Sequence, residues 1–159
     1  MKKYSLLFSS LFFLIMLCNS CTKDIFYEDI QSIQNETWHI DSTLHFEFTI
    51  TDPEQYYVFY LNVRNSTDFE TQYFYVFLTS EFPNGYIGKD TLGFIISTPV
   101  GEWTGRGNGR LKDNNFLYKK QVRFPHEGVY KFAIQQGMRE ENVKGIAGFG
   151  MTLFEYKPE

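Results

Sequence analysis

Residues 44–50, Leu-His-Phe-Glu-Phe-Thr-Ile, alternate apolar and polar side chains at every position. This two-residue period is typical of a β-strand that buries one face. Residues 51–54, Thr-Asp-Pro-Glu, follow as a turn, because proline already has the φ of the second turn position. Residues 56–64 then alternate again, with Tyr57 and Phe59 on the apolar face. The stretch therefore predicts two consecutive strands joined by a turn.

The same alternation continues along the chain, and turn residues separate one segment from the next. Asn84-Gly85 is a strong turn signal, and a second turn is expected at residues 113–115. Residues 72–82 are apolar on both faces, as expected for a central strand. Only residues 139–143 are expected to form a short helical turn. The further expected strands are residues 25–28 at a sheet edge, 72–82, 91–98, 118–124, 129–138 and 145–156.

Short strands of this kind, separated by turns and without a 3.6-residue period between them, decide the fold class. They predict an all-β protein with a single antiparallel β-sandwich or jelly-roll-like domain. The domain is expected to cover residues 37–159, which is an ordinary length for one domain with its own core.

The first 20 residues have the composition of a cleaved export signal. Two lysines open the chain, residues 6–17 are apolar, and Ser20 precedes Cys21. An apolar run of this length is too short to cross a bilayer as a helix. Ser20-Cys21 resembles the lipobox of bacterial lipoproteins, in which the cysteine sulfur takes a diacylglycerol and the new amine is usually acylated. Palmitate is the expected acyl group. The alternative is an ordinary signal peptide that ends at a coincidental cysteine.

Cys21 is the expected lipid attachment site. Cys18 is the weaker candidate, because the bulky Leu17 would occupy the small-residue position before it. No cysteine follows Cys21, so the mature chain has no intrachain disulfide, and acylation removes an otherwise unpaired thiol. We expect residues 1–20 to be the signal peptide and residues 21–36 to be a lipidated tether and edge segment.

The charge balance of the mature chain argues against nucleic acid as a partner. Without the signal, 13 lysines and arginines stand against 19 aspartates and glutamates. A mildly acidic domain gives no electrostatic reason to bind phosphates. It also lacks a polybasic cluster that would hold it to anionic lipids, so the acyl chains must supply the membrane attachment.

Catalytic motifs are absent from the sequence. His39, His45 and His126 lie in different expected elements, and none has the spacing of a zinc site. No nucleophile elbow is present, and no free cysteine remains. We therefore expect no enzyme activity, no metal and no cofactor. A tethered hydrolase with carboxylates brought together from distant strands remains the alternative.

Residues 101–109 carry glycines at 101, 105, 107 and 109 but do not read as a phosphate loop, because no helix is expected after them. Gly105, Gly107 and Gly109 would share one face of a strand and leave room for a neighbouring group such as Trp103. The stretch is interpreted as structural, so Gly107→Val should lower the melting temperature. A binding surface is the alternative.

Aromatic residues are dense, with 26 Phe, Tyr and Trp left after the signal. Most lie on the apolar phase of their expected strands, which favours a role in the core. The alternative is a platform of exposed rings that stack on sugars, as in carbohydrate-binding modules.

Several short motifs are informative through their order and spacing. They are Trp38 before Phe46-x-Phe48, Asn62-Val63-Arg64, Gly101-x-Trp103-x-Gly105-x-Gly107, Phe124-Pro125, Gly128-x-Tyr130, Met138-Arg139, Gly145-Ile146 and Gly148-x-Gly150. Together with the lipobox, they resemble the GldH family of gliding-motility lipoproteins over nearly the whole chain. The lipobox departs from the usual pattern at Cys18, where leucine is common.

The resemblance implies an outer-membrane lipoprotein that is a non-catalytic part of the gliding-motility and type IX secretion machinery. It implies contacts with other envelope proteins, no cofactor and no small-molecule substrate, and we expect the periplasmic face of the membrane. Aromatic and arginine side chains dominate the binding energy of protein interfaces, so the expected partner surface is Trp103, Arg106, Arg110 and Arg139. A glycan-binding lipoprotein that uses exposed aromatics is the alternative function.

Overall fold

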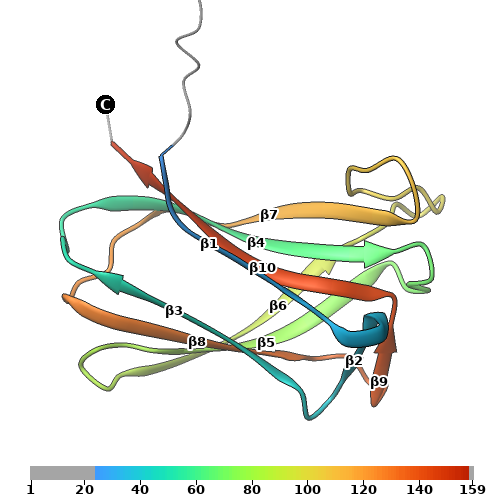
Figure 1. Cartoon of the computed structure of the whole chain (residues 1–159), viewed down its shortest axis with the longest axis horizontal. Coiled ribbons are helices and arrows are strands. Elements are labelled where there is room, and N and C mark those ends of the chain that lie inside the picture. Colours follow the sequence, from blue (N-terminus) through green and yellow to red (C-terminus); the bar gives the residue numbers. More distant parts are fainter. Residues whose placement is uncertain (1–23, 158–159) are drawn as a thin grey trace, which may run out of the picture.

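Two four-stranded antiparallel sheets face each other in the computed structural model, which describes residues 24–157 (Figure 1). The all-β antiparallel sandwich predicted from the sequence is confirmed. The expected signal peptide at residues 1–20 and the expected lipid site at Cys21 lie outside the described residues. Sheet 1 has the order β1-β10-β4-β7 and sheet 2 the order β3-β8-β5-β6, and a two-stranded sheet pairs β2 with β9.

The strand bounds follow the alternating segments of the sequence. Sheet 1 consists of β1 (Ile25–Ser32), β10 (Ile146–Tyr156), β4 (Tyr56–Ser66) and β7 (Leu111–Val122). Sheet 2 consists of β3 (Thr43–Ile50), β8 (Gly128–Gln136), β5 (Tyr73–Glu81) and β6 (Ile87–Ile95). The short pieces are the 3₁₀ turn η2 (Gln34–Glu36) and strands β2 (Thr37–His39) and β9 (Asn142–Lys144).

The core between the two sheets is rich in aromatic rings, as the strand pattern predicted. Phe46 and Phe48 of β3 are buried, and Phe46 lies opposite Phe132 of β8 in the ladder. Phe149 of β10 is fully buried, and its ring centroid lies 5.8 Å from that of Trp38. Most aromatic side chains of the domain therefore stabilise the fold through buried area and ring contacts.

The expected helical turn at residues 139–143 is wrong, because part of this segment forms β9. Val143 lies opposite Trp38 in the β2–β9 pair, and both side chains are buried. Burial of these two side chains against the core favours an extended strand over a helical turn at this point. Local propensity alone does not contain that contact.

The expected turn at residues 113–115 is also wrong, because β7 already begins at Leu111. Asn114 lies on the inward phase of β7 and is buried, where an apolar residue would have revealed the period. Its side-chain amide donates to Val63 O at 3.2 Å and to Asn65 Oδ1 at 2.9 Å. A buried polar network thus replaces an apolar contact at this position. Because the inward residue is polar, the alternating pattern that would predict a strand is interrupted here.

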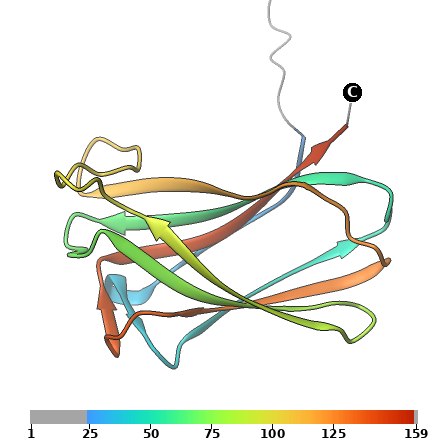
Figure 2. The same ribbon diagram turned by 180° about the vertical axis from the view of Figure 1, so that it is seen from behind.

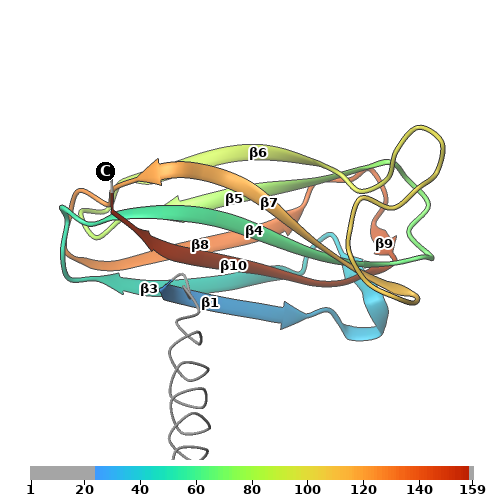
Figure 3. The same cartoon turned by 90° about the horizontal axis from the view of Figure 1, so that it is seen from above.

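The two ends of the sandwich hold different connections and short elements. The tether end is the end at which β1 begins and β10 finishes, and it holds the β3–β4, β5–β6 and β7–β8 connections (Figures 1 and 3). The far end holds η2, the β2–β9 pair, the β4–β5 connection and the β6–β7 loop, residues 96–110 (Figures 2 and 3). A chain that enters at the tether end therefore presents the far end at the greatest distance from its N-terminus.

Candidate interaction surfaces

The β6–β7 loop is held in place by backbone and side-chain hydrogen bonds. Arg106 and Asp113 exchange backbone hydrogen bonds of 2.9 and 2.8 Å. The amide of Thr104 donates to Ile96 O at 3.0 Å, and the Thr104 hydroxyl lies 2.9 Å from Asn114 Oδ1. The loop contains three of the four residues expected at a partner surface, and it presents them from a fixed backbone.

Gly105 and Gly107 of this loop are tightly packed, but for a different reason from the one expected. They lie in a loop and do not share one face of a strand, so that expectation was wrong. A Cβ on Gly105 would lie 2.7 Å from Asn114 Nδ2. Gly107 has a φ of +140°, and a Cβ there would lie 2.6 Å from Leu111 O. Both positions require glycine, whereas Gly109 has open space around it.

The four residues of the expected partner surface have different environments. Trp103 is half-buried and packs against the core, and Arg110 is engaged within the domain by two acidic side chains. Arg106 and Arg139 are exposed, and neither makes an ion pair with any residue in 24–157. Arg106 belongs to the β6–β7 loop, whereas Arg139 lies between β8 and β9. All four stand at the far end, but only the two exposed arginines are open to a partner.

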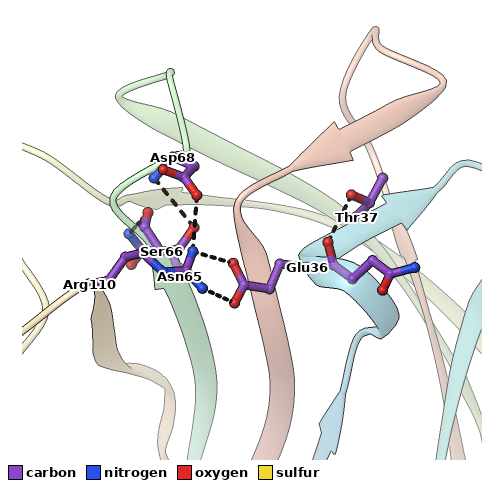
Figure 4. Close-up of polar contacts among 7 residues, drawn as sticks. Glu36, Thr37, Asn65, Ser66, Asp68 and Arg110 are labelled. Carbon is purple, nitrogen blue, oxygen red and sulfur yellow. Dashed lines mark hydrogen bonds and ion pairs between the residues drawn. The ribbon is translucent and has the colours of Figure 1, made fainter.

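Arg110 ties three distant segments together (Figure 4). Its guanidinium donates to both carboxylate oxygens of Glu36 and, at 2.9 Å, to Asp68 Oδ2. Glu36 belongs to η2, and Asp68 belongs to the β4–β5 connection. Asn35 and Glu36 have φ values of +53° and +52°, which residues other than glycine rarely adopt. The paired geometry of Arg110 and Glu36 helps to hold this unusual turn in its conformation.

Stability should depend on pH through Glu36. The hydrogen bonds from Arg110 lower the pKa of Glu36, so the folded chain binds this proton less readily than the unfolded chain. The contact therefore stabilises the fold above the ordinary glutamate pKa, and this contribution is lost as the pH falls through the lower folded-state pKa. In urea unfolding, Glu36→Gln should be less stable than the native chain at about pH 7, and the gap should narrow towards about pH 3.

The matched control for this measurement is Glu102→Gln. Glu102 is exposed and makes no ion pair within the described part of the chain, so its variant should follow the native pH curve. A Glu36→Gln curve that also runs parallel to the native one would show that Arg110 contributes nothing through this carboxylate.

An exposed apolar stripe lies on the outward face of sheet 2. We define the β5 stripe as Tyr73, Tyr75 and Phe77 of β5 together with Ile95 of β6. These side chains are 44, 41, 48 and 48% exposed, respectively. The rings of Tyr73 and Tyr75 are nearly parallel, at 19° and 6.3 Å between centroids. Large apolar side chains clustered on an exposed face are typical of an interaction site.

Glycines allow the rings of the β5 stripe to lie close to the backbone. A Cβ on Gly93 would lie 2.7 Å from Tyr75 Cε1, and one on Gly137 would lie 3.4 Å from Phe77 Cε2. Met138 is adjacent, since its sulfur accepts a hydrogen bond from the Tyr75 amide at 3.3 Å. The next residue in the chain is the exposed Arg139. Arg139 is thus one residue along the chain from the contact between Met138 and the Tyr75 amide.

The β5 stripe was not among the surfaces predicted from the sequence. Residues 72–82 were expected to be a central strand, and β5 is indeed an inner strand of sheet 2, but only Phe74, Val76 and Leu78 face the core. The signal that could have revealed the stripe is the presence of aromatics on both phases of one strand. In a two-layer sandwich one of those phases must face away from the core.

No arrangement typical of a catalytic or metal centre is found among the described residues. Within residues 24–157, no group of three His, Cys, Asp or Glu side chains could hold a metal ion. His39 lies 3.3 Å from Glu141 and His126 lies 3.1 Å from Asn84, both pairs being exposed. No helix of the described part is long and apolar enough to cross a membrane.

Comparisons with known proteins agree with one another over most of the chain. The family model described as GldH lipoprotein matches residues 25–153. The gliding motility lipoprotein GldH homolog of Christiangramia forsetii is 37% identical over 148 residues, which cover 89% of this chain and 90% of the relative. Gliding motility lipoprotein GldH of Flavobacterium johnsoniae is 28% identical over 145 residues, which cover 87% and 89%.

Solved structures resemble the domain only distantly. The VP2 subviral particle of infectious bursal disease virus matches 80% of this chain and 30% of that one, with 10% sequence identity and a TM-score of 0.35. A similarity this low carries no argument about function.

Proposed function

Because the chain belongs to the GldH family of gliding-motility lipoproteins, we propose that it is a lipid-anchored, non-catalytic component of the gliding-motility machinery that acts by binding other envelope proteins. Cys21 carries the lipid in this proposal. The machinery is associated with type IX secretion, and the domain stands on the periplasmic face of the outer membrane. Neither a cofactor nor a small-molecule substrate takes part.

The observation that carries this proposal is the β5 stripe. Tyr73, Tyr75 and Phe77 present aromatic area that the core does not use. The sulfur of Met138 contacts the Tyr75 amide, and the exposed Arg139 follows Met138 in the chain. Aromatic, methionine and arginine side chains are enriched in the buried centres of protein interfaces. We therefore revise the expected partner surface: Arg139 remains, Arg106 faces a different sheet, and Trp103 and Arg110 support the fold around them.

The tether gives the surface its orientation in the proposal. Only Thr22 and Lys23 separate Cys21 from Asp24, so the described domain begins within about 10 Å of the lipidated residue. A lipid on Cys21 would hold the tether end against the membrane. The far end, which includes the β8–β9 turn (Figure 3), would then point away from the membrane towards a partner. Arg139 belongs to this turn.

Phe77→Ala should remove partner binding without unfolding the domain. Truncation of a true anchor is expected to cost at least about 2 kcal/mol of binding, whereas truncation of an exposed side chain usually changes stability by at most about 0.5 kcal/mol. The measurement is crosslinking of the full-length lipoprotein in envelope membranes, followed by a motility assay. We expect the crosslinked product and gliding to be lost while the abundance of the protein is unchanged.

Leu117→Ala is the matched control, since Leu117 is 51% exposed and lies on β7 of the other sheet. This variant should crosslink and glide like the native protein. Normal crosslinking by Phe77→Ala would instead remove the β5 stripe from the partner surface, and the family-based part of the proposal would need another face.

Cys21→Ser should release the protein from the membrane. Without the sulfur no diacylglycerol can be attached, and the acidic domain has no polybasic cluster to replace it. Labelling with a clickable fatty acid and membrane fractionation check this expectation. Cys18→Ser is the control and should keep both the label and the membrane location, whereas continued labelling of Cys21→Ser would contradict the assignment.

A further inference from the structure

A polar groove lies on the outward face of sheet 1, on the opposite side of the sandwich from the β5 stripe. It is open to solvent, has a volume of about 440 Å³ and crosses all four strands of the sheet. We define this ladder groove by its lining residues, which are Glu28, Tyr60, Asn62, Arg106, Asn115, Thr152 and Phe154.

The floor of the ladder groove is a row of hydrogen-bonded side chains from four different strands. The hydroxyl of Thr152, a residue only 3% exposed, donates to Asn62 Oδ1 at 2.9 Å and lies 3.4 Å from Glu28 Oε1. Asn62 Nδ2 in turn donates to Asn115 Oδ1 at 3.0 Å. Each bond fixes the orientation of the next group, so the row is preorganised.

Both ends of this row retain hydrogen-bonding capacity. The Asn115 side chain is exposed, and its Nδ2 donates to no residue within 24–157. Glu28 is exposed at the other end and makes no ion pair with any described residue. The groove therefore offers a fixed amide donor on β7 and a carboxylate acceptor on β1.

Arg106 adds a further donor from above the sheet. The β6–β7 loop holds its backbone through the paired bonds with Asp113, and the close packing of Gly105 and Gly107 restricts the loop on either side. The guanidinium is exposed and makes no ion pair among the described residues. It is thus a charged donor at the groove that no acidic neighbour engages.

An apolar wall completes the ladder groove. Tyr60 of β4 and Phe154 of β10 meet edge to face, at 86° and 5.8 Å between ring centroids. Both are half-buried. Aromatic rings next to several fixed polar groups provide separate contacts for the C–H faces and the hydroxyl groups of one ligand.

From this combination we infer that the ladder groove binds an uncharged sugar residue of a glycan. Neighbouring hydroxyl groups both donate and accept hydrogen bonds, which suits Asn115, Glu28 and Arg106 together. A phosphate would be repelled by Glu28, and one carboxylate is too few for a typical divalent cation site. Strand addition by a peptide is excluded at the groove floor, because β10 and β4 are already paired on both sides.

This inference goes beyond the proposed protein contact, since the two surfaces lie on opposite sheets. A glycan on sheet 1 and a protein on sheet 2 can be bound at once. The glycan could come from the cell wall or from a polysaccharide of the envelope, and these sources share the hydroxyl chemistry that the groove recognises.

The test is calorimetric titration of the detergent-solubilised, full-length lipoprotein with three probes. These are soluble peptidoglycan fragments, cellohexaose and a soluble mannan. At least one should bind, and Asn115→Ala should weaken that binding about fivefold, which is the loss of one hydrogen bond. Asn115→Ala combined with Arg106→Ala should remove measurable binding. If peptidoglycan fragments bind most tightly, the source of the glycan is the cell wall. If cellohexaose or mannan binds most tightly, the source is a polysaccharide of the envelope.

Two controls keep the result interpretable. Asn108→Ala, an exposed amide in the same loop that does not line the groove, should bind like the native chain. Phe77→Ala should also bind the probe normally, although it is expected to lose the protein partner. The inference is overturned if no probe binds at millimolar concentration, or if binding survives in the Asn115/Arg106 double variant. Loss of glycan binding in Phe77→Ala alone would move the glycan to the β5 stripe.

Discussion

Gly145→Ala is expected to destabilise the folded domain by about 3 kcal/mol or more, or to prevent folding altogether. Gly145 joins β9 to β10 with a φ of +84°, a conformation that costs other residues roughly 1–2 kcal/mol. A Cβ there would overlap the backbone amide of Phe69 and lie 2.6 Å from its Cα. Backbone atoms cannot move aside as the end of a side chain can, so the overlap adds to the conformational cost.

The consequences of this change extend beyond one turn. The Gly145 amide donates to Glu36 O at 2.8 Å, and the Ser66 amide donates to Gly145 O at 2.8 Å. A displaced Gly145 would thus loosen both η2 and the end of β4. Urea unfolding followed by circular dichroism gives the free energy of unfolding for the comparison.

Gly109→Ala provides the matched control. It is also a glycine of the far end, but its φ is not in the left-handed range and nothing lies within 4 Å of a Cβ placed there. Its free energy of unfolding should stay within about 0.5 kcal/mol of the native value. Equal stability of the two variants would mean that the β9–β10 turn can relax around a side chain.

Phe149→Ala should cost about 3–5 kcal/mol of stability, the usual range for a buried aromatic truncated to alanine. Phe149 is fully buried in β10, and its ring centroid lies 5.8 Å from Trp38, 6.4 Å from Phe46 and 6.1 Å from Phe94. Phe46 and Phe94 belong to sheet 2 and Trp38 to β2, whereas Phe149 itself belongs to sheet 1. The cavity left behind would therefore remove ring contacts between the two layers.

The same Phe→Ala change at an exposed position shows how much of the lost stability comes from the packing of a buried ring. Phe77→Ala removes the same side chain from the β5 stripe and should change stability by at most about 0.5 kcal/mol. Thermal and urea unfolding of the two variants under identical conditions provide the comparison. A loss of several kcal/mol in Phe77→Ala would show that the stripe supports the fold, and it would weaken the case for a partner surface.

The sequence by itself determined the strands wherever one phase is apolar and the other polar. Residues 44–50 alternate without exception, and β3 (Thr43–Ile50) is formed there with Phe46 and Phe48 buried. Alternation is a local property, since neighbouring side chains on a strand must point to opposite faces. The family resemblance likewise depends on residues in their linear order, and the family match confirms it.

Local patterns failed where distant contacts decided the structure. The start of β7 could not be predicted, because the inward side chain of Asn114 is polar. Its hydrogen bonds to Val63 and Asn65 on a neighbouring strand make its burial possible. Residues 142–144 are a strand and not a helical turn, because Val143 packs opposite Trp38 across the β2–β9 pair. Neither partner can be inferred from the residues next to it in the chain.

Only the tertiary structure decided which surfaces are open and which side chains meet. Because of the strand order, β5 is an inner strand of sheet 2, and its outward-facing residues Tyr75 and Phe77 are exposed to solvent. Register brought Glu28 beside Thr152, a residue 124 positions away, and so built the floor of the ladder groove. Pairing order and register depend on how both sheets pack as a whole, because a shift of one residue moves every side chain of a strand to the other face.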